Sequence, residues 1–218
     1  MATQLVPLFP LPLVLLPAMP LQLHIFEDRY KEMMGEIIAA SEAGDRESEF
    51  GVVLAKDEGI INIGCTASVQ KVMRRYDDGR IDLLALGQRR FRIAGINEER
   101  SYLRADVEFF EDVDLTEVPA DLTRRARAGL LKLQSLEGMA DETEGGSSSR
   151  LSFKIAYLLD DVEKRQMVLA LRSEVERLDF LVRAIPDYLV KQERITLAKR
   201  VAPLNGHAKH SGSGNDHH

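Results

Sequence analysis

Residues 5–40 read LVPLFPLPLVLLPAMPLQLHIFEDRYKEMMGEIIAA, and this stretch decides the fold. Its first half, up to residue 23, is apolar and is interrupted repeatedly by proline. Because proline lacks a backbone amide donor and clashes with the preceding turn, no helix can run through this half. We therefore expect short extended segments with corners at the prolines, and neither a secretory signal core nor a membrane span.

The second half of the stretch predicts an amphipathic helix that begins at Asp28. Glu27 and Asp28 lie at its first turn, where carboxylates favour the positive end of the helix dipole. Apolar side chains recur there at the i, i+3, i+4, i+7 and i+8 spacing that places them on one face. We expect this face to pack on a sheet, with Glu36 on the opposite face. The apolar face consists of Tyr30, Met33, Met34, Ile37 and Ile38.

Short β-prone segments separated by turn residues follow this helix. Residues 50–54 and 60–63 each predict a buried strand. Residues 66–76 and 80–86 flank an Asp-Asp-Gly turn, which predicts a long hairpin because glycine accepts a positive φ.

Glycines predict two breaks after this hairpin. Gly87 and Gly95 bound a short segment in which Phe91 and Arg90 face opposite sides. Residues 103–109 then alternate apolar and charged side chains, which is typical of a half-buried strand. Several short antiparallel strands and one helix favour an α+β fold built on a small mixed-sheet pseudo-barrel, and not a βαβ arrangement.

An acidic segment that contains Pro119 separates the β-prone half from a helical half. Ser149 is the expected N-cap of the second helix of that half, and a capping box at residues 173–176 opens the last one. A kink is expected at Pro186. The helices are expected at residues 121–138, from residue 151, at residues 162–171 and from residue 173 towards residue 200.

The chain of 218 residues is long enough to bury a core without disulfides or metals. We divide it into a β-rich domain at residues 1–114, a helical bundle at residues 119–202 and a disordered tail at residues 203–218. The tail is polar and glycine-rich, so it has no apolar face to bury. Residues 141–149 are expected to form a flexible loop by composition.

Composition restricts the classes of function. Cys65 is the single cysteine, which excludes an internal disulfide and a thiolate metal cluster, and we expect it on a buried strand. A formal net charge of -6 argues against a protein whose main task is to hold nucleic acid. With no signal peptide, we expect a cytoplasmic protein without membrane contact.

No cofactor, catalytic site or metal site is expected. The sequence contains no G-x-x-x-x-G-K-[ST] loop that would cradle a nucleotide triphosphate. Ser152 and Lys154 lie two positions apart on a predicted helix, so they face different directions and do not form a catalytic dyad. His24 is expected to be a packed or turn residue. The other histidines lie in the tail without a fixed geometry: His207, His210, His217 and His218.

An apolar surplus between prolines at residues 11–19 is the candidate binding surface. Its side chains exceed what one sheet face can bury, so we expect some of them at the surface, where they would bind polypeptide. In the competing interpretation, the sheet and the first helix enclose all of them. The candidate residues are Leu13, Val14, Leu16 and Met19.

Basic clusters at residues 71–75, 89–92 and 124–127 point to an alternative function. The first two lie on strands predicted to pair, where they could form one positive face for RNA. They lack the interleaved aromatic side chains of a base-stacking surface, so solvated charge is the preferred interpretation.

Three blocks of the sequence carry a family resemblance. They are PLFPL, VLLP, PL and HIFEDRY within residues 7–30, LGQRRFRI at residues 86–93 after Gly64, and Gln166 with ERL at residues 176–178. In this order they resemble the N-terminal, substrate-binding domain of Lon proteases, over residues 5–202. Two positions depart from that family, because Asp28 stands where proline is frequent and Ala18 where glycine is common.

The resemblance implies a PUA-like pseudo-barrel with added helices and a role in protein turnover, as a stand-alone protein without ATPase or protease domains. We therefore expect a non-enzymatic recognition or adaptor module that binds unfolded or exposed apolar polypeptide segments, or a partner protein. A PUA-like RNA-binding module is the alternative, which the net charge opposes. The sequence makes no prediction of the oligomeric state.

Overall fold

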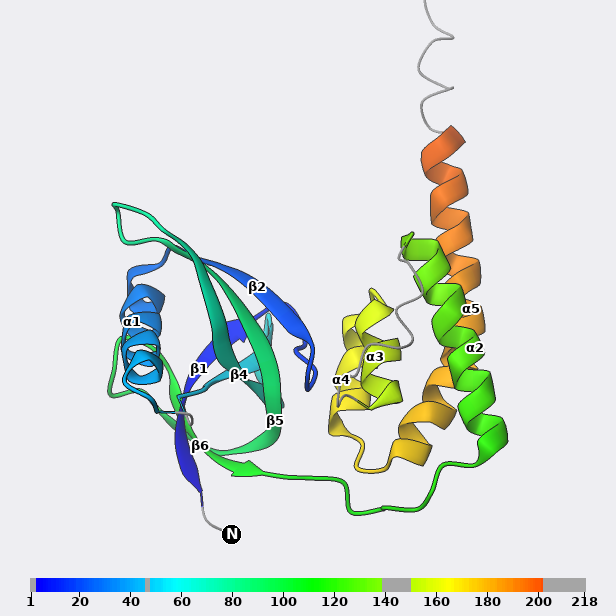
Figure 1. Cartoon of the computed structure of the whole chain (residues 1–218), viewed down its shortest axis with the longest axis horizontal. Helices are drawn as coiled ribbons and strands as arrows, with labels where there is room; N and C mark the ends of the chain where they lie inside the picture. Colours follow the sequence, from blue (N-terminus) through cyan, green and yellow to red (C-terminus); the bar gives the residue numbers. More distant parts are fainter. Residues whose placement is uncertain (1–2, 46–47, 139–149, 202–218) are drawn as a thin grey trace, which may run out of the picture.

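The computed structural model describes residues 3–45, 48–138 and 150–201. Strands dominate the first part of the chain and helices the second, which confirms the predicted α+β class (Figure 1). In chain order the elements are β1 (Gln4–Leu11), β2 (Pro20–Ile25), α1 (Asp28–Glu42), β3 (Phe50–Lys56), β4 (Gly59–Arg75), β5 (Ile81–Asn97), β6 (Arg104–Phe109), α2 (Ala120–Glu137), α3 (Leu151–Leu158), α4 (Val162–Ala170) and α5 (Glu174–Val201).

The strands form one sheet in the order β2-β5-β4-β3-β1-β6. Because β5 also pairs with β6, five of the strands close into a ring, and β2 is attached to the first half of β5. The pairing of β1 with β3 is parallel and the others are antiparallel, so the predicted mixed sheet is confirmed. A small apolar core lies where β1, β3, β5 and β6 meet, formed by Val6, Leu8, Val53, Phe91, Ala105 and Val107.

The predicted breaks at Gly87 and Gly95 are wrong, and so is the separation of residues 60–63 from residues 66–76. β4 and β5 each run without interruption, with register shifts at which the strands bend. At Gly64 and Gly87 the absence of a side chain allows close packing and does not end the strand. A Cβ on Gly64 would lie 2.5 Å from the carbonyl oxygen of Val52, which no other residue type could accommodate.

Helix α1 begins and packs as its sequence predicts. All five residues of its apolar face are buried, and the Phe9 and Tyr30 rings lie 4.3 Å apart between centroids. Glu36 lies on the exposed face but is not free of contacts. It accepts hydrogen bonds from Arg100 (2.5 Å) and from the Tyr102 hydroxyl (2.8 Å), which lower the pKa of its carboxyl, so its replacement is not a neutral change.

Helices α2–α5 pack on one another, α2 against α3 and α5, and α3 against α4 and α5. α2 ends as predicted at a glycine, Gly138, whose φ is 66°. The N-cap of α3 is Arg150, and Ser149 lies outside the described residues, as do the predicted loop and tail. Ser173 accepts a hydrogen bond from the Glu176 amide at the start of α5, as in half of a capping box.

Helix α5 continues through Pro186. After β6, the β-pairing within the described residues consists of one isolated bridge, between Asp114 and Ser173. Among the helices that the structure describes, none is long and apolar enough to cross a membrane.

Helix α1 provides a matched pair of stability tests. Ile37→Ala should lower the free energy of unfolding by about 2–4 kcal/mol, because it removes buried methyl groups and leaves a cavity. Gly35→Ala should instead raise it by about 0.5–1 kcal/mol, because Gly35 is exposed and an added Cβ would meet nothing within 4 Å. Urea midpoints measure both, and equal midpoints for the two variants would mean that the buried face is assigned wrongly.

Candidate functional site

The loop at residues 12–19 connects β1 to β2 and carries the four candidate binding residues. Val14, Leu16 and Met19 are buried, with exposed fractions of 6%, 1% and 7%, and Leu13 is half-buried. The expectation of surface exposure is therefore wrong for three of the four. The physical reason is that the loop folds onto the main apolar core, which continues from the sheet into helices α2–α5 and buries these side chains.

A pocket of about 640 Å³ lies over this loop. The loop and the start of β2 form one wall, and the end of α3 and the start of α4 form the other. All four candidate residues line it, although three of them expose little area. The loop wall is largely apolar and includes Leu15 and Leu21, and the helical wall presents Tyr157, Leu158, Asp160 and Arg165.

Hydrogen bonds hold the helical wall in place. The Arg165 guanidinium donates to the carbonyl oxygens of Ala156 (3.3 Å) and Tyr157 (2.9 Å), which lie in the last turn of α3. The Asp160 amide donates to the Tyr188 hydroxyl oxygen of α5 at 3.0 Å. These bonds satisfy polar groups that the end of a helix leaves without partners. Tyr157 keeps 38% of its surface exposed, so its ring is available at the pocket.

A β-bulge fixes the loop wall against β5. The Ala18 amide donates to the Gly87 carbonyl at 2.8 Å, and the Gly87 amide donates to the Met19 carbonyl at 2.9 Å. Ala18 has a φ of 60°, which is the left-handed first residue of a G1 bulge, a position that glycine usually occupies. This conformation favours glycine, which is the residue that the resemblance of the sequence leads us to expect at residue 18. A Cβ on Gly87 would lie 2.2 Å from the Leu16 carbonyl oxygen, so residue 87 must be glycine.

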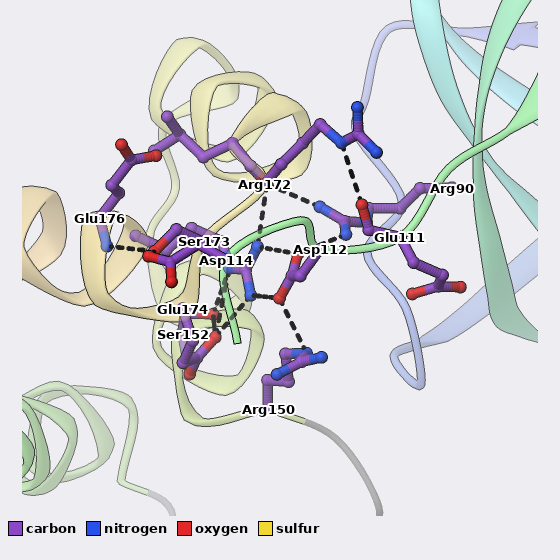
Figure 2. A network of polar contacts seen from close by, with 12 residues as sticks. Arg90, Glu111, Asp112, Asp114, Arg150, Ser152, Arg172, Ser173, Glu174 and Glu176 are labelled. Carbon is purple, nitrogen blue, oxygen red and sulfur yellow. Dashed lines mark hydrogen bonds and ion pairs between the residues drawn. The ribbon is translucent and has the colours of Figure 1, made fainter. Parts of the chain in front are cut away.

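A buried carboxylate joins the strand half to the helical half beside this loop. The side chains of Arg90, Asp112 and Arg177 are at most 3% exposed. Arg90 of β5 donates to Asp112 at 2.6 Å, and Arg177 of α5 donates through two nitrogens at 2.8 and 2.7 Å. Figure 2 shows Asp112 at the junction, with Arg150 approaching from the start of α3 at 3.3 Å.

The network extends into both halves. Arg90 also donates to the carbonyl oxygens of Leu169 (3.3 Å) and Leu171 (2.7 Å) at the end of α4. Arg177 donates to Glu174 at 2.7 Å and to the Ser152 hydroxyl at 2.9 Å. The charges of the two arginines are therefore paired within the described residues, and β5 is tied directly to the helices that form the pocket wall.

The surroundings of Asp112 act on its pKa in opposite directions. Burial alone would raise the pKa, but hydrogen bonds from Arg177 and Arg90 outweigh burial and lower it to about 2. The network was not predicted from the sequence, because its charged residues lie far apart in the chain and the cluster that contains Arg90 was interpreted as solvated charge. The one available signal was the charged side chain at residue 90, which adjoins the apolar Phe91 within a strand.

The basic clusters do not form one positive face. On β4, Lys71 and Arg75 pair with the beginning of β5, whereas residues 89–92 lie farther along β5, opposite the middle of β4. Their charges also have acidic partners, since Arg75 pairs with Glu42 and Arg89 with Glu49. In the third cluster, Arg124 and Arg125 pair with Asp121.

The remaining candidates occupy separate places. His24 lies on β2 and not in a turn, and although it is exposed its ring packs against Phe26 and Tyr76, with Nδ1 2.5 Å from the Asp82 carboxylate of β5. Ser152 is buried and donates to Glu174 at 2.7 Å. Cys65 is buried on β4 as predicted, and burial raises the pKa of its thiol. No cluster of three metal-binding side chains occurs in the described part of the chain, and the tail histidines lie outside it.

Replacing the buried carboxylate tests the junction between the halves. Asp112→Asn should lower the free energy of unfolding by about 3–5 kcal/mol, because it leaves the buried Arg90 guanidinium without an anion and the buried Arg177 guanidinium with Glu174 alone. Asp121→Asn, which removes an exposed carboxylate, should cost at most about 1 kcal/mol. Urea midpoints near neutral pH compare the two, and similar losses would contradict the assigned role of Asp112.

The pH dependence of stability tests the same contact. Because the folded pKa of Asp112 is lowered from 3.8 to about 2, its contribution is fully present above the unfolded value. It is lost as the pH falls through the interval between those two values. The wild-type chain should therefore lose more stability than Asp112→Asn when the pH falls from 5 to 2. Parallel stability curves for the two proteins would show that folding does not lower the pKa of Asp112.

The bulge predicts a stabilising substitution. Ala18→Gly should raise the free energy of unfolding by up to about 1 kcal/mol, because the left-handed conformation strains alanine and not glycine. The greater chain entropy of glycine in the unfolded state offsets part of this gain. Gly87→Ala should lower it by about 1–3 kcal/mol through the clash with the Leu16 carbonyl. Thermal unfolding of both variants measures this pair of opposite shifts, and a loss of stability in Ala18→Gly would contradict the strain at residue 18.

Comparison with known proteins places this geometry in a family. The family model for the ATP-dependent protease La (LON) substrate-binding domain matches residues 5–186. The fold resembles a Lon N-terminal domain protein from Xanthomonas campestris, with 24% identity, a TM-score of 0.64, and coverage of 83% of this chain and 98% of that chain. It also resembles the N-terminal domain of the Mycobacterium avium complex Lon protease, with 16% identity, a TM-score of 0.52, and coverage of 84% and 99%. Because the family model spans most of its length, the chain belongs to the family of ATP-dependent protease La (LON) substrate-binding domains.

Proposed function

We propose that this chain binds unfolded or exposed apolar polypeptide segments in the pocket between the loop at residues 12–19 and helices α3 and α4. The observation that carries the proposal is the pocket itself, in a chain that belongs to a substrate-binding family. Its volume of about 640 Å³ lies within the range of ligand sites, and its surface is divided almost evenly between apolar and polar groups.

Two side chains supply the accessible apolar contact. Leu13 is the least buried of the four candidates and projects from the loop wall, and Tyr157 is exposed on the opposite wall. A client side chain between them would be removed from water on both sides. Val14, Leu16 and Met19 then form the floor, where they contribute shape and depend on the fold for their position.

The proposal also includes an assignment of the two parts of the fold to known types and to two domains. We treat the ring of strands as PUA-like and α2–α5 as a helical bundle, with domains at residues 1–114 and 119–202 and the client between them. Under this proposal the chain recognises clients or acts as an adaptor in protein turnover in the cytoplasm, and it catalyses nothing itself. The family match supports the last point, because it covers a substrate-binding domain and no ATPase or protease domain.

Paired measurements of client affinity and stability test the site. Leu13→Asp should weaken binding of fluorescein-labelled β-casein by roughly 5–30-fold, the equivalent of about 1–2 kcal/mol of apolar contact. Its melting temperature should fall only modestly, because Leu13 is half-buried. Tyr157→Ser should weaken binding in the same way. Leu16→Asp should unfold the chain, since it places a charge in the core.

The matched control is Leu131→Asp on α2, where the leucine is 44% exposed and lines none of the pockets described. It should leave casein affinity unchanged. Equal losses of affinity in Leu131→Asp and Leu13→Asp would show that casein binds to exposed apolar surface in general. Unchanged affinity in both Leu13→Asp and Tyr157→Ser would remove the pocket as the site.

A further inference from the structure

Strand β2 has one open edge. Every other described strand pairs with at least two neighbours, because the ring closes through β5 and β6, whereas β2 pairs with β5 alone. No backbone group of Gln22 or His24 bonds to a segment outside the sheet among the described residues. The open edge therefore offers unpaired amides and carbonyls, which form a template for another strand.

The bulge at Ala18 determines which groups are free. The Gly87 amide bonds to the Met19 carbonyl, and in an antiparallel pair such bonded positions recur every second residue. With the observed register, Leu21, Leu23 and Ile25 share their backbone bonds with β5. Pro20, Gln22 and His24 consequently direct their backbone groups away from β5, towards the open edge.

Proline at residue 20 agrees with this assignment. Proline is tolerated in a sheet where its missing amide would point away from the neighbouring strand. Pro20 aligns with Leu86 of β5 and costs no bond there. The outer edge thus presents the Pro20 carbonyl and both backbone groups of Gln22 and His24, enough to pair with a segment of about five residues.

The open edge adjoins the proposed pocket. Pro20, Leu21 and Gln22 of β2 line it together with Tyr157 on the opposite wall. Figure 1 shows β2 on the side of the strand half that faces α3 and α4. A strand added to this edge would therefore lie along the pocket, where every second side chain can enter it.

We propose that the client binds in an extended conformation, as an additional strand on the outer edge of β2. This inference rests on the proposed function and specifies the form of its client. A helical client satisfies its own backbone groups and would leave the edge unpaired, whereas an extended segment supplies complementary donors and acceptors at the same spacing. Backbone pairing accepts many sequences, and the pocket selects for apolar side chains at alternate positions.

Substitution at residue 22 tests the backbone contact. Gln22→Pro removes one outward amide without removing a bond to β5, and it should weaken binding of labelled β-casein at least 10-fold while the chain stays folded. Gln22→Ala keeps the amide and should bind as the wild-type chain does. Leu23→Pro removes an amide that bonds to β5, so it should lower the melting temperature sharply and verify the register.

Backbone-modified clients test the same contact without altering the protein. Two versions of one casein-derived peptide are N-methylated at alternate residues, one at the odd positions and one at the even positions. One version should lose binding and the other should keep it, because only alternate amides of an added strand face β2. If Gln22→Pro does not fold, this pair of peptides decides the question on the wild-type chain.

The outcomes separate this inference from the proposed function. If Leu13→Asp weakens binding but Gln22→Pro binds as Gln22→Ala does, the pocket holds the client and the added strand is wrong. Equal binding of the two N-methylated peptides would also overturn it. If Gln22→Pro abolishes only a concentration-dependent dimer, the edge serves a second copy of this chain instead. If Leu13→Asp and Tyr157→Ser leave binding intact, the proposed function itself fails.

Discussion

The contact of Asp112 with Arg90 and Arg177 is the interaction on which the arrangement of the two halves depends. Each of the three groups is buried, and a buried charge is tolerated only when it is paired and fully hydrogen-bonded. Arg90 belongs to a strand, and its acidic partner Asp112 also binds Arg177 of α5, so one carboxylate ties the strand half to the helical half. Arg177 has a second acidic partner, Glu174, on its own helix. Hydrogen bonds among these buried charges have strict distances and directions, so they fix the helices that form one wall of the pocket relative to β5. Apolar packing alone would allow more variation in the distance between the two walls.

Strand β5 is the frame that places the parts of the site relative to one another. Its first half carries β2, Gly87 holds the bulge that anchors the loop, and Arg90 follows three residues later. If the strand were broken at Gly87, the loop that bonds to Gly87 and the helices that bond to Arg90 would not be held at a fixed distance from each other. The continuity of β5 through this glycine therefore matters for the pocket as much as for the sheet.

Local patterns predicted the local elements, and the errors concern long-range contacts. The face of α1 and the hairpin turn at Gly79 follow from spacing and from glycine's tolerance of positive φ, both of which a short window contains. Gly87 is required because the Leu16 carbonyl, which lies 71 positions earlier in the chain, leaves no room for a side chain. A short stretch of sequence does not contain this contact, so Gly87 was predicted to end a strand. The contact of Asp112 with Arg90 and Arg177 was missed for the same reason. A charged residue is expected at the solvent-exposed surface unless its partner is known, and here the partners are distant in the sequence.

The loop at residues 12–19 is both a wall of the pocket and part of the apolar core. All four candidate residues line the pocket, and the expectation that some of them lie at the surface holds at most for Leu13, since Val14, Leu16 and Met19 are buried. Under the proposed function the loop needs to be rigid when it binds a client, and the packing of its apolar side chains into the core would supply that rigidity.

Among the described strands, β2 is the one that pairs with a single neighbour, and its open edge lies beside the pocket. An open edge is normally a liability, because copies of a protein can pair through it. Here Tyr157 and the other residues of the α3–α4 wall lie across the pocket from the first half of β2. A second copy docking symmetrically through β2 would bring its own helical wall to the junction, whereas a single extended segment brings none. The position of the helices therefore favours a lone strand over a folded sheet at this edge.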